Sequence, residues 1–275
     1  MIWRAVDRFW EFPQAPLIMG IVNVTPDSFS DGGRYGTLEA AVQHALHLVE
    51  SGANILDIGG ESSRPGAEPV NEEEEFQRVI PVIEKLAGQT DIAISIDTQK
   101  PAIAKAALNA GAIIINDIAA NREDETMWQL VAETGSGYVA MHMLGDPKTM
   151  QRNPKYVDVI NDIEAFFYCR MERWTDWGMS LEQVVLDPGI GFGKTLEHNL
   201  TLLKGLERLT RMERPLAVGA SRKSFIGDLT GAEVNDRLPG SLASACRAAQ
   251  AGVAIIRTHD VMETAQALKV WAATN

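Results

Sequence analysis

The chain has 275 residues and 45% hydrophobic content, which is enough to bury the core of one large α/β domain or two small ones. Its formal net charge of −12 argues against a nucleic-acid-binding or anionic-membrane surface. Cys169 and Cys246 match no disulfide framework or metal spacing, which favours a reducing compartment. Charged residues between Arg4 and Glu11 exclude a signal peptide, and no run is long enough to span a membrane. We expect a cytoplasmic protein.

Short apolar runs rich in β-branched residues alternate with amphipathic stretches. The runs predict parallel strands covered on both faces, and the stretches predict helices. The expected strands are Leu17–Val22, Asn54–Ile58, Ile92–Ile96, Ile113–Ile115, Tyr138–Met143, Val184–Leu186, Leu216–Val218 and Ala254–Ile256. The expected helices are Leu38–Glu50, Glu72–Ala87, Pro101–Ala110, Thr126–Thr134, Val157–Trp177, Leu196–Arg211, Ser241–Ala251 and Val261–Ala272.

Eight strand–helix units in a chain of this length predict an α/β protein with a single (β/α)8 TIM barrel domain over residues 1–275. An open doubly wound sheet stays possible, because hydrophobic periodicity does not report closure. The N-terminal extension, with Trp3, Phe9, Trp10 and Phe12, is expected to cover the barrel floor.

Almost every expected strand ends in a polar or charged side chain. These ends meet on the face that carries the chemistry of (β/α)8 barrels. A helix cap or a loop ion pair is the simpler interpretation of any single one, such as Asp97 shortly before Pro101. As a set they predict a ligand site, since buried polar groups are costly without partners. The positions are Asn23, Asp57, Asp97, Asn116, Asp117, His142, Asp187, Ser221, Arg257 and His259.

The charges within the set divide between strands. Arg222, Lys223, Arg257 and His259 follow the last two strands, where this fold often binds phosphate, and Ser224 opens a short helix there. Carboxylates and an amide follow the third, fourth and sixth strands, and a carboxylate pairs well with a planar donor edge. The pattern predicts a flat, nitrogen-rich heterocycle at the centre and a phosphate group to one side.

Three segments need separate interpretation. DPGIGFGKT, residues 187–195, is no Walker loop because Pro188 replaces a required glycine, and the dinucleotide fingerprint fails at Lys194. TPDSFSDGG, residues 25–33, and GGESSRPG, residues 59–66, are glycine-rich and are expected to be mobile lids. Ordinary surface turns would explain their glycines, but not Phe29 among polar residues or Arg64 beside Pro65.

Several segments, in this order, resemble the dihydropteroate synthase family: MGIVNVTPDSFSDGG, DIGGESSRPGA, INDI, MHM-x-G-x-P-x-x-MQ, DPGIGFGKT and SRKSFIG. The resemblance covers the chain from about Leu17 to the C-terminus. It implies a (β/α)8 barrel, commonly a homodimer, that acts in folate synthesis with Mg²⁺. The implied reaction joins 4-aminobenzoate to 6-hydroxymethyl-7,8-dihydropterin diphosphate and releases diphosphate, with no nucleic acid or membrane as partner.

The resemblance also implies a role for individual residues. A pterin pocket would contain Asp97, Asn116, Asp187 and Lys223. A diphosphate and magnesium site would contain Asn23 as metal ligand, Arg257 and His259, with Ser63 and Arg64 closing on it. The walls and carboxylate anchor of the aminobenzoate pocket would be Phe29, Pro65 and Ser224. Of these, the residues expected to take part in catalysis are Asn23, Asp97, Lys223, Arg257 and His259.

Two departures from the family pattern are visible, at Ser63 in ESSRPG, where ESTRPG is commoner, and at Thr258 in RTHDV, where RVHDV is common. Ser63 keeps the hydroxyl, and Thr258 is expected to point away from its functional neighbours.

The reaction that the resemblance implies agrees with the basic side chains found after the last two expected strands. A ring-stabilised cation forms as the methylene C–O bond breaks, so stabilising the departing diphosphate is the main task, and the arylamine is the nucleophile. Two alternatives stay open: a pterin-binding methyltransferase barrel, which would need no basic cluster or SRKS motif, and a non-catalytic pterin-binding paralogue, which should have lost loop or basic residues.

Overall fold

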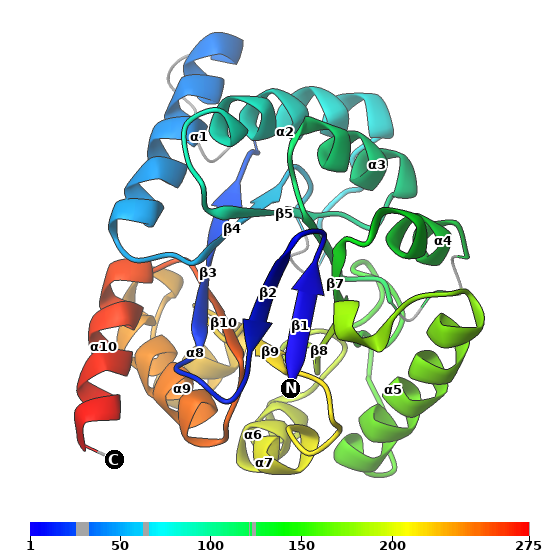
Figure 1. Cartoon of the computed structure of the whole chain (residues 1–275). Helices are drawn as coiled ribbons and strands as arrows, with labels where there is room; N and C mark the ends of the chain where they lie inside the picture. Colours follow the sequence, from blue (N-terminus) through cyan, green and yellow to red (C-terminus); the bar gives the residue numbers. More distant parts are fainter. Residues whose placement is uncertain (26–32, 63–65, 121, 123–124, 275) are drawn as a thin grey trace.

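The computed structural model describes residues 1–25, 33–62, 66–120, 122 and 125–274 of the chain. Its centre is an eight-stranded parallel sheet in the order β8-β7-β6-β5-β4-β3-β10-β9 (Figure 1). Leu186 on the first edge bridges Leu216 beside the last edge, and its N–H donates to Pro215 O at 2.9 Å. The sheet therefore curls into a nearly closed (β/α)8 barrel, and an open sheet is excluded. The strands are β3 (Leu17–Asn23), β4 (Ile55–Gly59), β5 (Ala93–Asp97), β6 (Ile114–Asp117), β7 (Gly137–Met141), β8 (Val184–Asp187), β9 (Ala217–Val218) and β10 (Ile255–Thr258).

Helices surround the barrel on its outer side (Figure 1). They are α1 (Gly33–Glu50), α2 (Glu72–Ala87), α3 (Pro101–Ala110), α4 (Glu125–Thr134), α5 (Val159–Asp176), α6 (Leu196–Lys204), α7 (Leu206–Leu209), α8 (Ser224–Thr230), α9 (Leu238–Gln250) and α10 (Val261–Thr274). Two single turns of 3₁₀ helix, η2 (Leu181–Gln183) and η3 (Val234–Asp236), precede β8 and α9.

The expected helix boundaries are confirmed where the sequence contains a residue that favours the start of a helix. Glu72–Ala87 and Pro101–Ala110 form helices over those residues, because Asn71 caps the first and Pro101 begins the second. The expected single helix Leu196–Arg211 is wrong, since the chain breaks it at Gly205 into α6 and α7. A Cβ at Gly205 would lie only 2.3 Å from Ile160 Cδ1, so α5 packs against the break itself.

Two apolar cores lie on the two sides of the barrel wall. The larger fills the space between strands and helices. The smaller lies inside the barrel, and it joins alternate residues of the strands, such as Met19, Ile55 and Val139, to Trp3 and Phe12 of the N-terminal segment. Because neighbouring residues of a strand point to opposite faces, Ile55 inside places Asp57 inside as well.

The N-terminal segment covers the floor as the sequence predicts. It forms an antiparallel hairpin of β1 (Ile2–Ala5) and β2 (Arg8–Glu11) at the end of the barrel nearest the viewer in Figure 1. Trp3 is completely buried, and its indole N–H donates to Gln183 O at 2.9 Å. The expected covering role of Phe9 is wrong, because Phe9 is 66% exposed. It pairs with Arg4 on the outer face, whereas Trp10 stacks on Trp3.

Candidate active site

The centre of the barrel mouth is an ion-pair network around Arg257 of β10. Its Nε donates to Asp57 Oδ2 and its second terminal nitrogen to Asp97 Oδ2, both at 2.6 Å. The Asn116 amide donates to the same Asp57 oxygen at 2.9 Å. Four strands, β4, β5, β6 and β10, therefore contribute to one connected group.

This network holds more acid than base. Burial, with a contribution from the carboxylate of Asp57, raises the pKa of Asp97 to about 7 against the opposing effect of Arg257. Burial alone would lower the pKa of Arg257, but Asp57 and Asp97 outweigh it and the pKa is raised. Asp57 Oδ1 is buried and has no hydrogen-bond partner among the described residues. The network can therefore accept further hydrogen bonds from a bound ligand.

Asp187 and Lys223 form the neighbouring part of the mouth. Asp187 is 6% exposed, and its Oδ1 accepts the Gly189 N–H at 2.7 Å. Burial raises its pKa, although this hydrogen bond opposes the rise. Burial and the adjacent Arg257 lower the pKa of Lys223 to about 7, and its Nζ lies 3.8 Å from the ring centroid of Phe192. A lysine amino group on an aromatic face, beside a carboxylate, offers both a donor and an acceptor to a flat, polar ring.

The wall between β7 and β8 is backbone packed on backbone. Gly189 and Gly193 have φ of +67° and +62°, which favours glycine at both positions. A Cβ at Gly189 would lie 2.0 Å from His142 O, and one at Gly193 would lie 2.8 Å from Leu144 O. Lys194 is 3% exposed and ties this wall together, because its Nζ donates to Phe192 O at 2.9 Å and lies 3.2 Å from His142 Nδ1.

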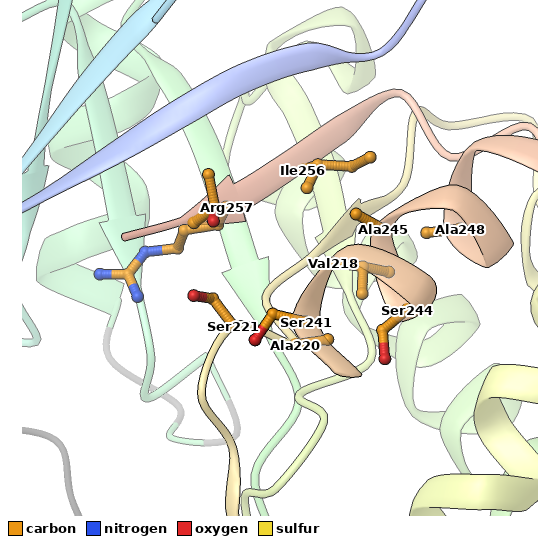
Figure 2. Close-up of a pocket in the computed structure, with 10 residues that line it drawn as sticks. Val218, Ala220, Ser221, Ser241, Ser244, Ala245, Ala248, Ile256 and Arg257 are labelled. Atoms are coloured by element: carbon orange, nitrogen blue, oxygen red, sulfur yellow. The ribbon is translucent and has the colours of Figure 1, made fainter. Parts of the chain in front are cut away.

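Basic and hydroxyl groups follow β9 and β10. Ser221 Oγ lies 3.1 Å from His259 Nδ1, and burial lowers the pKa of His259 to about 3, with Arg257 and Arg222 adding to the effect. Ser221 and Arg257 also line a small internal pocket against α9. Figure 2 shows the Arg257 side chain extending from β10 away from the α9 residues of that pocket.

The comparisons with known proteins agree with this arrangement. A family model described as pterin binding enzyme matches residues 19–259. The chain belongs to the pterin binding enzyme family. All of the strands from β3 to β10 fall at least partly within the matched residues, as do the polar groups at their ends.

Relatives in this family are similar over almost the whole chain. The dihydropteroate synthase of Escherichia coli strain K12 is 49% identical over 259 residues, which are 94% of this chain and 92% of that protein. A crystal structure of the Yersinia pestis dihydropteroate synthase with a sulfonamide drug complex has a TM-score of 0.93 and 46% identity, and covers 100% of this chain and 99% of that one. The Xanthomonas albilineans dihydropteroate synthase with 4-aminobenzoic acid has a TM-score of 0.88 and 47% identity, with 94% and 93% covered.

The structure brings together most of the site residues expected from this family. Asp97, Asn116 and Arg257 form the central group, and Lys223 and Asp187 lie near enough to interact with it electrostatically. His259 lies next to Arg257, and Ser224 is exposed at the start of α8. The expected residues Phe29, Ser63, Arg64 and Pro65 lie outside the described residues.

Three polar residues among the strand ends have structural partners instead. The carboxylate of Asp117 accepts the Tyr138 hydroxyl at 2.7 Å and the Ala119 N–H at 2.8 Å. Arg222, expected in the basic cluster, forms an ion pair with Asp260, with Nε 3.1 Å from Oδ2, and is exposed. Thr258 is buried and lies 3.2 Å from the Thr264 hydroxyl, pointing away from the mouth as expected.

Asp57 is among the polar strand ends that the sequence predicts for the site, but no specific role was expected for it. Phe192 and Lys194 were not expected there. The position of Asp57 could have been found from the alternation of side chains along β4, because an Ile55 that points into the barrel requires the residue two positions later to point inward as well. Phe192 and Lys194 lie in a glycine turn without periodicity, so their approach to Lys223 and His142 had no sequence signal.

The residues fit a Mg²⁺ carried by a phosphate ligand better than a dedicated metal centre. Among the described residues, no three His, Cys, Asp or Glu side chains are grouped to hold a metal. Asn23 is partly buried at the end of β3, in register with Gly59, which is in register with Asp97. The missing side chain at Gly59 leaves space between the two polar groups, and Mg²⁺ bound through phosphates needs few protein ligands.

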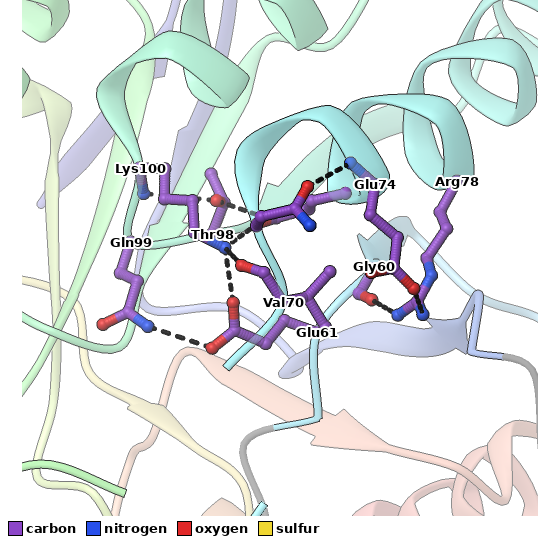
Figure 3. Close-up of polar contacts among 10 residues, drawn as sticks. Gly60, Glu61, Val70, Glu74, Arg78, Thr98, Gln99 and Lys100 are labelled. Carbon is purple, nitrogen blue, oxygen red and sulfur yellow. Dashed lines mark hydrogen bonds and ion pairs between the residues drawn. The ribbon is translucent and has the colours of Figure 1, made fainter. Parts of the chain in front are cut away.

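A second polar network holds the start of the segment that follows β4 (Figure 3). Lys100 Nζ donates to Glu61 Oε2 at 2.5 Å and to Val70 O at 2.6 Å, and it also pairs with the buried Glu75. Arg78 donates to Gly60 O at 2.6 Å. These contacts fix Gly60 and Glu61 directly before the expected Ser63 and Arg64.

Proposed function

We propose that the chain is a dihydropteroate synthase, which condenses 6-hydroxymethyl-7,8-dihydropterin diphosphate with 4-aminobenzoate to give 7,8-dihydropteroate and diphosphate. The observation that carries the proposal is the Arg257 network, in which one mouth joins buried acceptors for a flat heterocycle to cations for a diphosphate. A relative 47% identical to this chain has been solved with 4-aminobenzoic acid, which supports the second substrate.

Acidic and amide side chains bind the pterin, and basic side chains bind the diphosphate. Asp187 and Asn116 offer a carboxylate and an amide to the pterin edge, where charge-assisted hydrogen bonds orient the ring. Arg257 and His259 face the departing diphosphate. As the C–O bond of the methylene breaks, the bonding pair leaves with the diphosphate, and the amine nitrogen of 4-aminobenzoate forms the new C–N bond and then loses a proton. Fixed donors at the departing anion stabilise it without reorganisation.

The proposal includes a Mg²⁺ ion, for which Asn23 is the protein ligand. When bound, the ion supplies positive charge to the leaving diphosphate. Asn23 would orient it at the rim of β3, beside the space left by Gly59. A cytoplasmic location and a homodimer complete the proposal and rest on the family resemblance. Among the described residues, no helix has the length and apolar character needed to cross a membrane.

Release of diphosphate that depends on 4-aminobenzoate tests the function. We expect the wild-type chain to release diphosphate only when the pterin diphosphate, Mg²⁺ and 4-aminobenzoate are all present. Pterin binding without this release would favour the methyltransferase barrel or the non-catalytic paralogue and would contradict the proposal.

His259→Ala should weaken the binding of diphosphate, with little change in the affinity for the free pterin alcohol. Arg257→Ala should weaken both, because Arg257 also contacts Asp97.

A further inference from the structure

Two hydrogen bonds join Ser221 to His259 across the ends of neighbouring strands. Ser221 follows β9 and His259 follows β10, which is paired with β9. The Ser221 Oγ lies 3.2 Å from the backbone N of His259 and 3.1 Å from its ring Nδ1. Ser221 is buried, and it contacts His259 at both its backbone and its ring.

The direction of the hydrogen bond between the Ser221 hydroxyl and the ring decides which ring nitrogen of His259 is protonated. A backbone N–H only donates, so the Ser221 oxygen accepts from the amide of His259. A hydroxyl has one hydrogen and a second lone pair, so Ser221 can either donate to Nδ1 or accept from an Nδ1–H. When Ser221 donates, Nδ1 carries no proton and the neutral imidazole carries its proton on Nε2. Only this arrangement offers an Nε2–H donor to an anion.

The surrounding charges keep the ring neutral. Arg257 of β10 and Arg222 and Lys223 of the turn after Ser221 all disfavour an imidazolium, in addition to burial. Asp260 opposes them, but its carboxylate is already paired with Arg222. With its pKa lowered to about 3, the His259 ring is neutral at neutral pH and carries a single N–H.

The turn that carries Ser221 is itself fastened to α9. The Arg222 N–H donates to Ser241 Oγ at 2.9 Å, and Ser241 donates in turn to Arg237 O at 3.0 Å. Arg222 has a φ of +57°, so the chain turns sharply between Ser221 and Lys223. Ser221 and Ser241 both line the pocket of Figure 2, where α9 lies against β9 and β10.

We propose that Ser221 is a positioning residue that fixes the His259 tautomer with its proton on Nε2, so that this nitrogen donates to the anionic leaving group. The identity of that group as a diphosphate rests on the proposed function. Without the hydroxyl, the ring populates both tautomers. The tautomer protonated on Nδ1 turns a lone pair toward the anion and repels it.

Nitrogen NMR of the ligand-free, ¹⁵N-histidine-labelled chain tests the tautomer directly. His259→Gln identifies the resonances of His259 among those of the five histidines. We expect an unprotonated Nδ1 and a protonated Nε2 in the wild type, and shifts averaged between the tautomers in Ser221→Ala. Ser221→Thr keeps the hydroxyl, has the pocket for its methyl group, and should restore the wild-type pattern.

Ser244→Ala is the matched control. Ser244 lines the same pocket, but its hydroxyl donates to Gly240 O at 2.8 Å. A wild-type ring protonated on Nδ1 would overturn the proposal without any variant. A Ser221→Ala ring that keeps the pure Nε2 tautomer would overturn it as well.

Calorimetric titration with inorganic diphosphate and Mg²⁺ measures the consequence for binding. Ser221→Ala should bind diphosphate about three- to tenfold more weakly, as expected for one weakened hydrogen bond, while Ser244→Ala and Ser221→Thr bind as the wild type does. The pterin alcohol should bind Ser221→Ala and the wild type equally. Equal diphosphate affinity in Ser221→Ala would contradict the positioning role. A wild type that binds no diphosphate would instead overturn the proposed function, which the NMR result does not depend on.

Discussion

Arg257 and Asp57 are joined by a 2.6 Å hydrogen bond, although they stand 200 residues apart and their strands are not neighbours. The side chain of Arg257 crosses β3, which separates β10 from β4 in the sheet, since Arg257 is in register with Met19 and Asp57 with Ile21. Asp57 is fully buried, whereas the Arg257 side chain is 19% exposed. The bond therefore connects opposite sides of β3 at the level where the substrates are proposed to bind.

Replacing Arg257 should be costly for stability as well as for activity. Arg257→Met leaves the buried carboxylates of Asp57 and Asp97 without their shared cation, and we expect a loss of about 3–5 kcal/mol in the free energy of unfolding. Arg4→Met, which breaks an exposed ion pair with Glu182, should cost no more than about 1 kcal/mol. Urea titration of both variants measures the difference. Equal losses would show that the Arg257 network does not stabilise the fold.

Asp187 ends β8 and Asp117 ends β6, with β7 between them, and replacing each should affect a different property. Asp187→Asn should weaken pterin binding by at least about 1.5–3 kcal/mol, the contribution of a charged hydrogen bond. Asp117→Asn should leave pterin affinity unchanged and lower stability, because Asp117 accepts hydrogen bonds from Tyr138 and Ala119. Calorimetry with an unreactive pterin analogue, paired with thermal melts, separates the two. Unchanged affinity in Asp187→Asn would remove that residue from the site.

Lys223 should make stability depend on pH in the alkaline range. Burial lowers its pKa to about 7 in the folded chain from an ordinary 10.5. Between these values the unfolded chain binds more protons than the folded one, so this contribution to stability rises with pH. The unfolding free energy of the wild type minus that of Lys223→Met should therefore rise from about pH 7 toward about pH 10, by up to about 1.4 kcal/mol per unit. A flat difference would contradict a neutral folded Lys223; Lys85→Met, at the surface, is the control.

The floor hairpin should affect stability without affecting substrate selectivity. Trp3→Ala removes a fully buried ring and its hydrogen bond to Gln183 O, and we expect a loss of about 3–5 kcal/mol. Phe9→Ala, in the same hairpin but exposed, should change stability by no more than about 0.5 kcal/mol. Michaelis constants for both substrates should be unchanged in both variants. A selective rise for one substrate in Trp3→Ala would show that the floor communicates with the mouth.

Much of this arrangement follows from local pattern. Each apolar run became a strand because its residues are buried on both faces, and the polar residues at the ends of the runs were placed at one mouth by the parallel topology. The fold and the proximity of Asp97, Asn116 and Arg257 could therefore be predicted.

What could not be predicted depends on distances between turns. Whether Arg222 or Lys223 faces the mouth is decided by the positive φ at Arg222, which sends its side chain to Asp260 and leaves Lys223 against Phe192. The break at Gly205 depends on where Ile160 lies, 45 residues earlier. Neither contact leaves a periodic trace in the sequence.

Close backbone packing limits which substitutions the wall between β7 and β8 can accept. Gly189 lies against the backbone of His142, and Gly193 against that of Leu144. Neither glycine can acquire a side chain without separating β7 from β8. New ligand shapes on this side must then be accommodated by the neighbouring side chains alone, and Met141, Met143 and Met150 cluster there with Phe192. Methionine refits its neighbours by rotation at small cost. We therefore expect sequence changes on this wall to occur at its methionines, while the turn that carries Gly189 and Gly193 stays the same.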